Sequence, residues 1–169
     1  MNPWLSQVNQ KLFFARVLLE QYGLKEDRHG HIELVLCQAV VYQLECAYRH
    51  HLREVAATYK SAAPEVIDSV ERLVVELTGI GKHPAEAQEM MDLEQDVGSW
   101  LQQMLSVWQS FHQLPRLEAE ADTNSPIPVM QVAEASQRVL AELNISQVTS
   151  WLDALQELVN RHRELMVEC

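Results

Sequence analysis

The stretch from residue 32 to residue 59 constrains the fold most, because 28 residues pass without a proline, a glycine or another turn signal. Strands are usually about 3–10 residues long, so this length predicts a helix even though Val40 and Val41 favour strands. Apolar residues occupy much of its circumference, namely Leu34, Val35, Leu36, Ala39, Val40, Val41, Leu44 and Ala47. A helix that is apolar nearly all round is normally buried among others. The sequence therefore predicts a central helix.

Apolar residues at helical spacing continue on both sides of this stretch. The further predicted helices cover Pro3 to Tyr22, Pro64 to Leu77, Pro84 to Phe111, Val129 to Leu143 and Gln147 to Met166. In the helix beginning at Pro84, apolar residues recur at steps of three and four, as in bundle packing, and we place Gly98 inside it. For the last helix we expect Ser146 to be the N-cap.

These helices predict an all-α fold and one domain. A length of 169 residues fits a single domain, and only 5 glycines and 6 prolines argue against a turn-rich β fold. We expect residues 1–169 to form an antiparallel helical bundle of four to five main helices, with a long loop before the C-terminal helices. That loop, residues 116–128, is rich in turn formers and acids, so we expect it to be a mobile connection.

The charge of the chain narrows the classes of partner. There are 13 Lys and Arg residues against 24 Asp and Glu residues, which gives a net charge of −11. Binding to nucleic acid or to an anionic membrane surface depends on basic residues, so we expect neither as a partner. No run of about 18 uncharged apolar residues predicts a membrane span.

Two further features predict a cytoplasmic protein. Lys11, Arg16 and Glu20 interrupt the first 22 residues, so no apolar core of a secretory signal is present there. Cys37 and Cys46 lie nine residues apart on the central helix, about 13.5 Å at the rise of an α-helix, which is too far for a disulfide.

A cluster near the end of the central helix is the first candidate site. His50 and Glu54 are four residues apart and share a helix face. With His162 from the last helix, this pair supplies two histidines and a carboxylate, the minimum for non-haem iron or catalytic zinc, and His51 is a further candidate beside it. The alternative is a solvated polar face, with His162 as a hydrogen-bonded core histidine. We favour this alternative and expect no cofactor.

Other enzyme signatures are incomplete. Glu26 precedes His29 by three residues, but a carboxylate-bridged di-iron bundle needs a second such pair, and the chain has none. Cys37 and Cys46 lie in the most apolar helix, where a thiol is inert. No glycine-rich phosphate loop follows a predicted strand. These gaps favour a protein without catalytic activity over an enzyme.

An acidic segment is the second candidate site. Residues 84–122 contain eight carboxylates against Arg116 alone, a net charge of −7. The segment either forms a solvated face or docks a basic partner. The residues that we expect to bind such a partner are Glu86, Glu89, Asp92 and Asp96.

Each end of the chain carries a recognisable motif: the segment from Asn9 to Ala15, and a C-terminal pattern of Trp151-Leu152, Leu155, Leu158-Val159, Arg163-Glu164 and Met166. In these motifs the chain resembles a small uncharacterised helical family of gammaproteobacteria. Together these cover about 30 residues. The resemblance implies a bacterial cytosolic helical protein of unknown function, and it carries over no site residue.

Two hypotheses about function follow. The first is a non-enzymatic protein-interaction or scaffold module, with a protein partner or with a second copy of itself in a homodimer. The second is a metal-dependent or small-ligand-binding bundle that uses His50, His51, Glu54 and His162. We favour the first, because each catalytic pattern lacks a necessary member.

Overall fold

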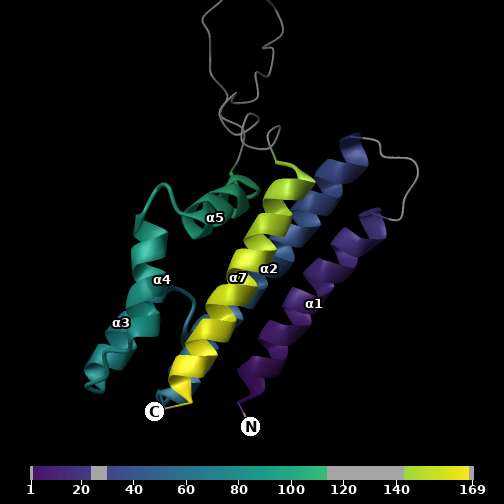
Figure 1. Cartoon of the computed structure of the whole chain (residues 1–169). Helices are drawn as coiled ribbons and strands as arrows, with labels where there is room; N and C mark the ends of the chain where they lie inside the picture. The colour runs from purple at the N-terminus through teal and green to yellow at the C-terminus, as the bar shows by residue number, and fades with distance from the viewer. Residues whose placement is uncertain (1, 24–29, 114–142, 168–169) are drawn as a thin grey trace, which may run out of the picture.

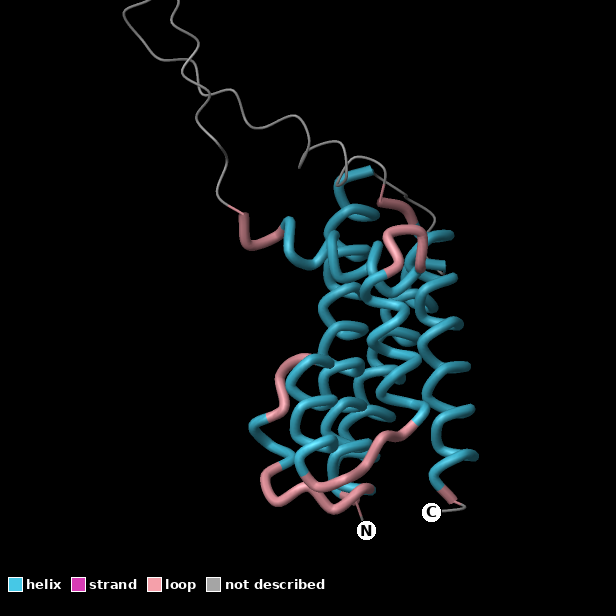
Figure 2. The backbone as a smooth tube through the Cα atoms, turned by 90° about the vertical axis from the view of Figure 1, so that its left-hand side faces the viewer, coloured by secondary structure: helices cyan, strands magenta, loops and turns pink. Residues whose placement is uncertain are grey.

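The computed structural model describes residues 2–23, 30–113 and 143–167, and every regular element among them is helical (Figure 1, Figure 2). The elements are α1 (Pro3–Gly23), α2 (Gly30–Thr58), the short 3₁₀ helix η1 (Pro64–Val66), α3 (Val70–Gly79), α4 (Ala85–Gln95), α5 (Trp100–Ser110) and α7 (Ile145–Met166). The all-α prediction is confirmed for these residues. The predicted mobile connection at 116–128 and the helix predicted from residue 129 lie outside them, except for Leu143.

The central position predicted for α2 is confirmed. This helix packs against α1, α3, α4, α5, α7 and η1. Its fully or almost fully buried apolar residues are Cys37, Val40, Val41, Leu44, Ala47, Tyr48, Leu52, Val55 and Ala56. A helix with so much buried apolar surface needs neighbours on several sides. Despite this apolarity, none of the described helices has the length and hydropathy needed to cross a membrane.

Helix α1 lies antiparallel to α2, as predicted. Near its start, the Asn2 side chain donates a hydrogen bond to the Glu54 carbonyl at 3.0 Å. At its other end, the Tyr22 hydroxyl donates to Glu33 at 2.9 Å. The residues of α1 buried between these contacts include Val8, Leu12 and Ala15, which follow the predicted stripe.

Helix α7 runs parallel to α2, so the predicted antiparallel arrangement does not extend to this pair (Figure 1). The Ile145 N–H at the start of α7 donates to Glu33 near the start of α2, at 3.4 Å. Near the other end of both helices, Arg163 contacts Glu54. The N-cap is Asn144, whose side chain accepts from the Gln147 N–H at 3.0 Å, so the prediction of Ser146 as N-cap is wrong by two residues.

The prediction of one continuous helix from Pro84 to Phe111 is wrong. The chain leaves the helical path at residues 96–99, between α4 and α5. Asp96 accepts from the Gly98 N–H at 2.9 Å, and Ser99 caps α5 by accepting from the Gln102 N–H at 3.0 Å. Val97, one of the apolar residues at the three- and four-residue steps of that predicted helix, is 78% exposed. Gly98 thus belongs to the turn and not to a helix interior.

The helix predicted from Pro64 to Leu77 is also divided. Residues 64–66 form η1, and α3 begins at Val70 after Ser69, whose side chain accepts from the Arg72 N–H. The interruption buries Ile67 completely. Together α3, α4 and α5 return the chain to the end of the fold where α2 begins (Figure 1). This return explains why α7 runs parallel to α2.

Candidate functional site: a buried histidine–glutamate network

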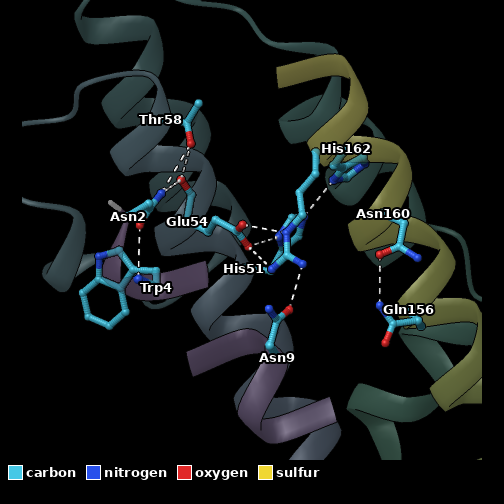
Figure 3. A network of polar contacts seen from close by, with 10 residues as sticks. Asn2, Trp4, Asn9, His51, Glu54, Thr58, Gln156, Asn160 and His162 are labelled. Carbon is cyan, nitrogen blue, oxygen red and sulfur yellow. Dashed lines mark hydrogen bonds and ion pairs between the residues drawn. The ribbon is translucent and has the colours of Figure 1, made fainter. Parts of the chain in front are cut away.

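Two histidines and two glutamates from three helices form a continuous line of hydrogen bonds, which we call the buried network. It consists of Glu54 and His51 from α2, His162 from α7 and Glu89 from α4. Figure 3 shows Glu54, His51 and His162 pointing toward one another between α2 and α7. The network links segments that are far apart in the sequence.

The α2 part of the network is the most enclosed. His51 and Glu54 are three residues apart, so both project from one face of the helix. The Nδ1 atom of His51 lies 3.1 Å from Oε2 of Glu54, and both side chains are at most 2% exposed. The same face carries Leu44, Ala47 and Val55, all fully buried. His51 therefore belongs to the core side of α2.

The connection to α7 is a direct contact between the two imidazoles. Nε2 of His51 lies 2.9 Å from Nδ1 of His162. The ring planes differ by 23° and the ring centroids are 5.1 Å apart, so the rings meet nearly edge to edge. Both histidines are fully buried. This contact leaves no room for a bridging atom larger than hydrogen in the observed arrangement.

The connection to α4 continues from the same imidazole. Nε2 of His162 lies 3.0 Å from Oε2 of Glu89. Glu89 also accepts from Arg161, the residue directly before His162 on α7. Unlike Glu54, Glu89 is partly exposed, with 36% of its side chain accessible. The network thus has one buried end at Glu54 and one end near the surface at Glu89.

The buried end is neutralised by an arginine. Arg163 donates to both oxygens of Glu54, at 2.7 and 3.1 Å, and to the Asn9 side chain of α1 at 2.8 Å. Burial raises the pKa of Glu54, but the hydrogen bonds from His51 and Arg163 outweigh it, and the resulting pKa lies below the usual value. Glu54 is therefore a carboxylate at neutral pH.

The pKa values of Glu89 and His162 are also shifted by their surroundings. Burial raises the pKa of Glu89, yet hydrogen bonds from His162 and Arg161 bring it below its ordinary value. Burial lowers the pKa of His162, and the adjacent His51 lowers it further, against the opposing effect of Glu89. Both glutamates are thus held as anions, whereas burial and the neighbouring His51 disfavour the protonated form of His162.

The family of this protein is shown by sequence comparison. Over residues 1–169 the chain matches the family described as "Family of unknown function (DUF6586)". The chain belongs to this family. The terminal motifs of the chain predicted membership of an uncharacterised family, and the match confirms this prediction. No curated protein and no solved structure matches the chain.

The structure brings together three of the four residues considered for metal. His51, Glu54 and His162 meet in the buried network, but His50 faces the other side of α2. Its ring stacks on Trp4, with centroids 5.7 Å apart, and its Nδ1 lies 3.4 Å from Arg53. Burial lowers the pKa of His50, helped by the Arg53 charge.

The donor atoms of the network do not converge on one point. They form a line in which each imidazole uses both of its ring nitrogens. Among the described residues, no group of three or more His, Cys, Asp or Glu side chains is placed to hold a metal ion. Glu26 and His29, the incomplete di-iron pair of the sequence analysis, lie outside the described residues.

The four predicted partner-binding carboxylates have different surroundings. Glu86 is 3% exposed and accepts from the Tyr59 hydroxyl at 3.2 Å, and Glu89 belongs to the buried network. Asp92 on α4 and Asp96, directly after its last residue, are exposed. The sequence did not indicate that Glu86 and Glu89 face inward, because their partners, Tyr59 and His162, belong to distant segments of the chain.

Residues that the sequence analysis missed complete both sites. Glu89 entered the analysis only as a surface acid, and Arg161 and Arg163 did not enter it as site residues. The sequence contains one signal for the two arginines. They directly flank His162, so if His162 is buried, Arg161 and Arg163 lie at the two edges of the buried face of α7. Such cations favour carboxylates nearby.

A separate cleft of about 490 Å³ lies between α2, α3, α4 and α5. Trp108 forms part of its wall, so this tryptophan contributes to a pocket as well as to the core. At its inner side the buried Tyr48 hydroxyl donates to Glu94 at 2.6 Å. Burial raises the pKa of Glu94, and nearby Glu71 raises it further. The cleft is thus acidic.

Proposed function

We propose that this protein is a non-enzymatic interaction module that binds a basic protein segment through an acidic surface on α4 and α7. We define the acidic surface as the exposed residues Asp92, Asp96, Asp153, Glu157 and Glu164. The observation that carries the proposal is that these carboxylates, from two helices, line two shallow hollows of about 540 and 460 Å³. Sequence analysis placed the acidic residues on one helix, and α7 now adds three of them.

The charge of the acidic surface is poorly compensated. Arg161 is the basic residue among those lining the two hollows in the described part of the chain, and it is engaged by Glu89 and Glu157. Asp92 accepts from the uncharged Gln88 at 2.7 Å. A surface with such an excess of anions attracts a basic segment over a distance.

The enclosure of the buried network supports the non-enzymatic part of the proposal. Histidine is the commonest general acid or base in enzymes, and the two histidines of the network, His51 and His162, are both 0% exposed. Each ring nitrogen faces another side chain of the network, so a substrate has no ring nitrogen to approach. In this proposal the buried network has a structural role, and the acidic surface binds the partner.

We also propose a cytoplasmic location. Cys37 and Cys46 are free thiols on α2, and burial raises the pKa of Cys37 to about 11. Thiols of this kind suit a reducing compartment. Fractionation of the source cell, with antibody detection, tests the location, and recovery in an extracytoplasmic fraction would contradict it.

The experiment for the proposed function is affinity capture from source-cell extract, followed by reconstitution with each captured protein in purified form. The test variant is Asp92→Lys with Asp153→Lys and Glu157→Lys. It changes the acidic surface but spares Glu86 and Glu89, whose reversal would also damage the interior. The matched control is Glu20→Lys with Glu65→Lys and Glu71→Lys, three exposed acids elsewhere.

We expect the purified partner to carry a Lys/Arg-rich segment and to bind wild type and control alike. The test variant should bind at least tenfold more weakly, and wild-type binding should weaken steeply between 50 and 300 mM salt, because exposed charges are screened beyond about 8 Å at physiological salt. Binding that survives both the reversal and the salt would reject the acidic surface. It would favour an apolar contact, including self-association as a homodimer.

A further inference from the structure

We propose that the facing nitrogens of His51 and His162 form a binding site for a single proton, which the two imidazoles share in the folded protein. The inference concerns the interior and is independent of the proposed partner surface. It follows from counting the protons that the buried network needs. Three contacts join its four members, and each contact needs one proton between two electron pairs.

The two glutamates determine which ring nitrogens carry hydrogen. Glu54, bound by two N–H groups of Arg163, can only accept, so Nδ1 of His51 must donate to it. Glu89, bound by Arg161, can likewise only accept, so Nε2 of His162 must donate to it. A neutral imidazole has a single N–H. Both protons of a neutral pair are therefore already used.

The remaining two nitrogens then meet without a proton. In a neutral pair, Nε2 of His51 and Nδ1 of His162 would point lone pairs at each other across 2.9 Å. One additional proton turns this repulsion into a hydrogen bond of ordinary length, in line with the nearly coplanar rings. The pair then carries one positive charge.

The charges that face the pair from each neighbouring helix favour that charge. Helix α4 contributes Glu89 and the nearby Glu86, α2 contributes Glu54, and α7 contributes Arg161 and Arg163. Helix α1 contributes the uncharged Asn9, which accepts from Arg163. Three carboxylates against two guanidinium groups leave one negative charge, which a single shared proton neutralises. A second proton would place two cations side by side, consistent with the lowered pKa of His162.

A metal ion is the other cation that could lie between two such lone pairs, with the glutamates holding the outer nitrogens. The distance disfavours it. Two Zn–N bonds of about 2.0–2.1 Å in a tetrahedral site separate the nitrogens by about 3.4 Å, more than the observed contact. No third donor completes a ligand set among the described residues. We therefore assign the position to a proton.

The test is nitrogen-detected NMR of the histidine side chains in ¹⁵N-labelled full-length protein, recorded from pH 5 to pH 9. The informative variant is Glu89→Gln, because an amide N–H can donate to Nε2 of His162. His162 is then free to donate from Nδ1 to His51, and two neutral rings satisfy all three contacts. Asp92→Asn, an exposed change on the same helix, is the control.

In wild type and control we expect the pair to retain one extra proton at pH 8, well above the ordinary histidine pKa of about 6.5. In Glu89→Gln that proton should be lost at least one pH unit lower, with the fold intact by circular dichroism. A neutral wild-type pair at pH 8, or the same titration in Glu89→Gln, would overturn the proposal. So would one equivalent of metal in protein purified without a His tag.

Discussion

Arg163 on α7 donates to both carboxylate oxygens of Glu54 on α2, although 109 residues separate them in the sequence. This two-point contact holds the buried end of the network in place and joins the parallel helices near their C-terminal ends. Glu54 is 2% exposed at its side chain, so it cannot replace a lost arginine with water. The pair therefore predicts a large effect of mutation.

Arg163→Met should destabilise the protein by about 3 kcal/mol, because it leaves a buried carboxylate without its main partner. Methionine keeps most of the apolar stem, so the loss reports the charge contact and not the packing. Arg161→Met is the matched control, since its pair with Glu89 is partly exposed and should contribute at most about 1 kcal/mol. Urea unfolding at pH 7 measures both, and equal losses would contradict the assignment.

The turn between α4 and α5 depends on Ser99. Its side chain accepts from the Gln102 N–H and donates to the Leu93 carbonyl. Ser99 is also buried. Ser99→Ala should therefore cost about 1–2 kcal/mol in the free energy of unfolding. Ser69→Ala removes a longer, more exposed cap bond of 3.3 Å at α3 and should cost less. A thermal unfolding series that reverses this order would count against our account of the turn.

Tyr48 is expected to stabilise Glu94 as a carboxylate. Tyr48→Phe removes the donor of a 2.6 Å hydrogen bond from a buried position, which should cost about 1–2 kcal/mol at pH 7. Because the pKa of Glu94 is already raised, the folded state gains protons more readily there as the pH falls. The cost should therefore shrink toward pH 4. Tyr42→Phe, at a more exposed tyrosine, should change stability by less than about 0.5 kcal/mol.

The helices were largely predictable because periodicity and length are local properties. The central helix was found from its unbroken apolar run, and the last helix from the stripe around Trp151 and Leu155. The turn at residues 96–99 was missed, since Leu93, Val97 and Trp100 continue the helical spacing across it. Its signal was polar: an aspartate, a glycine and a serine capable of capping follow one another within four residues.

The candidate site was only partly predictable because its contacts join distant segments. The sequence offered His50 with Glu54, a pair with four-residue spacing, whereas the structure pairs His51 with Glu54 at three-residue spacing. His51 shares its helix face with Leu44 and Val55, and this periodicity was available. The role of Glu89 could not be predicted, because its histidine partner lies 73 residues later in the sequence. Nothing in the local sequence distinguishes such an acid from one that faces water.

The measurement that tests the account most directly is the free energy of unfolding from pH 4 to pH 9, for wild type and for the double variant His51→Gln/His162→Gln. Below the ordinary histidine pKa of 6.5, the unfolded chain binds two protons on these residues and the folded chain one, so stability should fall with falling pH. The lowered pKa values of Glu54 and Glu89 add a further loss below about pH 4.5.

Above pH 6.5 the folded chain keeps one proton that the unfolded chain has released, so stability should fall again as the pH rises. The account predicts that the difference between wild type and double variant has its maximum near pH 6.5 and declines on both sides. His50→Gln, whose ring lies outside the network against Trp4, should keep the decline of stability above pH 6.5. It should lessen the loss at lower pH, because the pKa of His50 is lowered in the folded protein. A difference that rises steadily from pH 5 to pH 9 would contradict the shared proton.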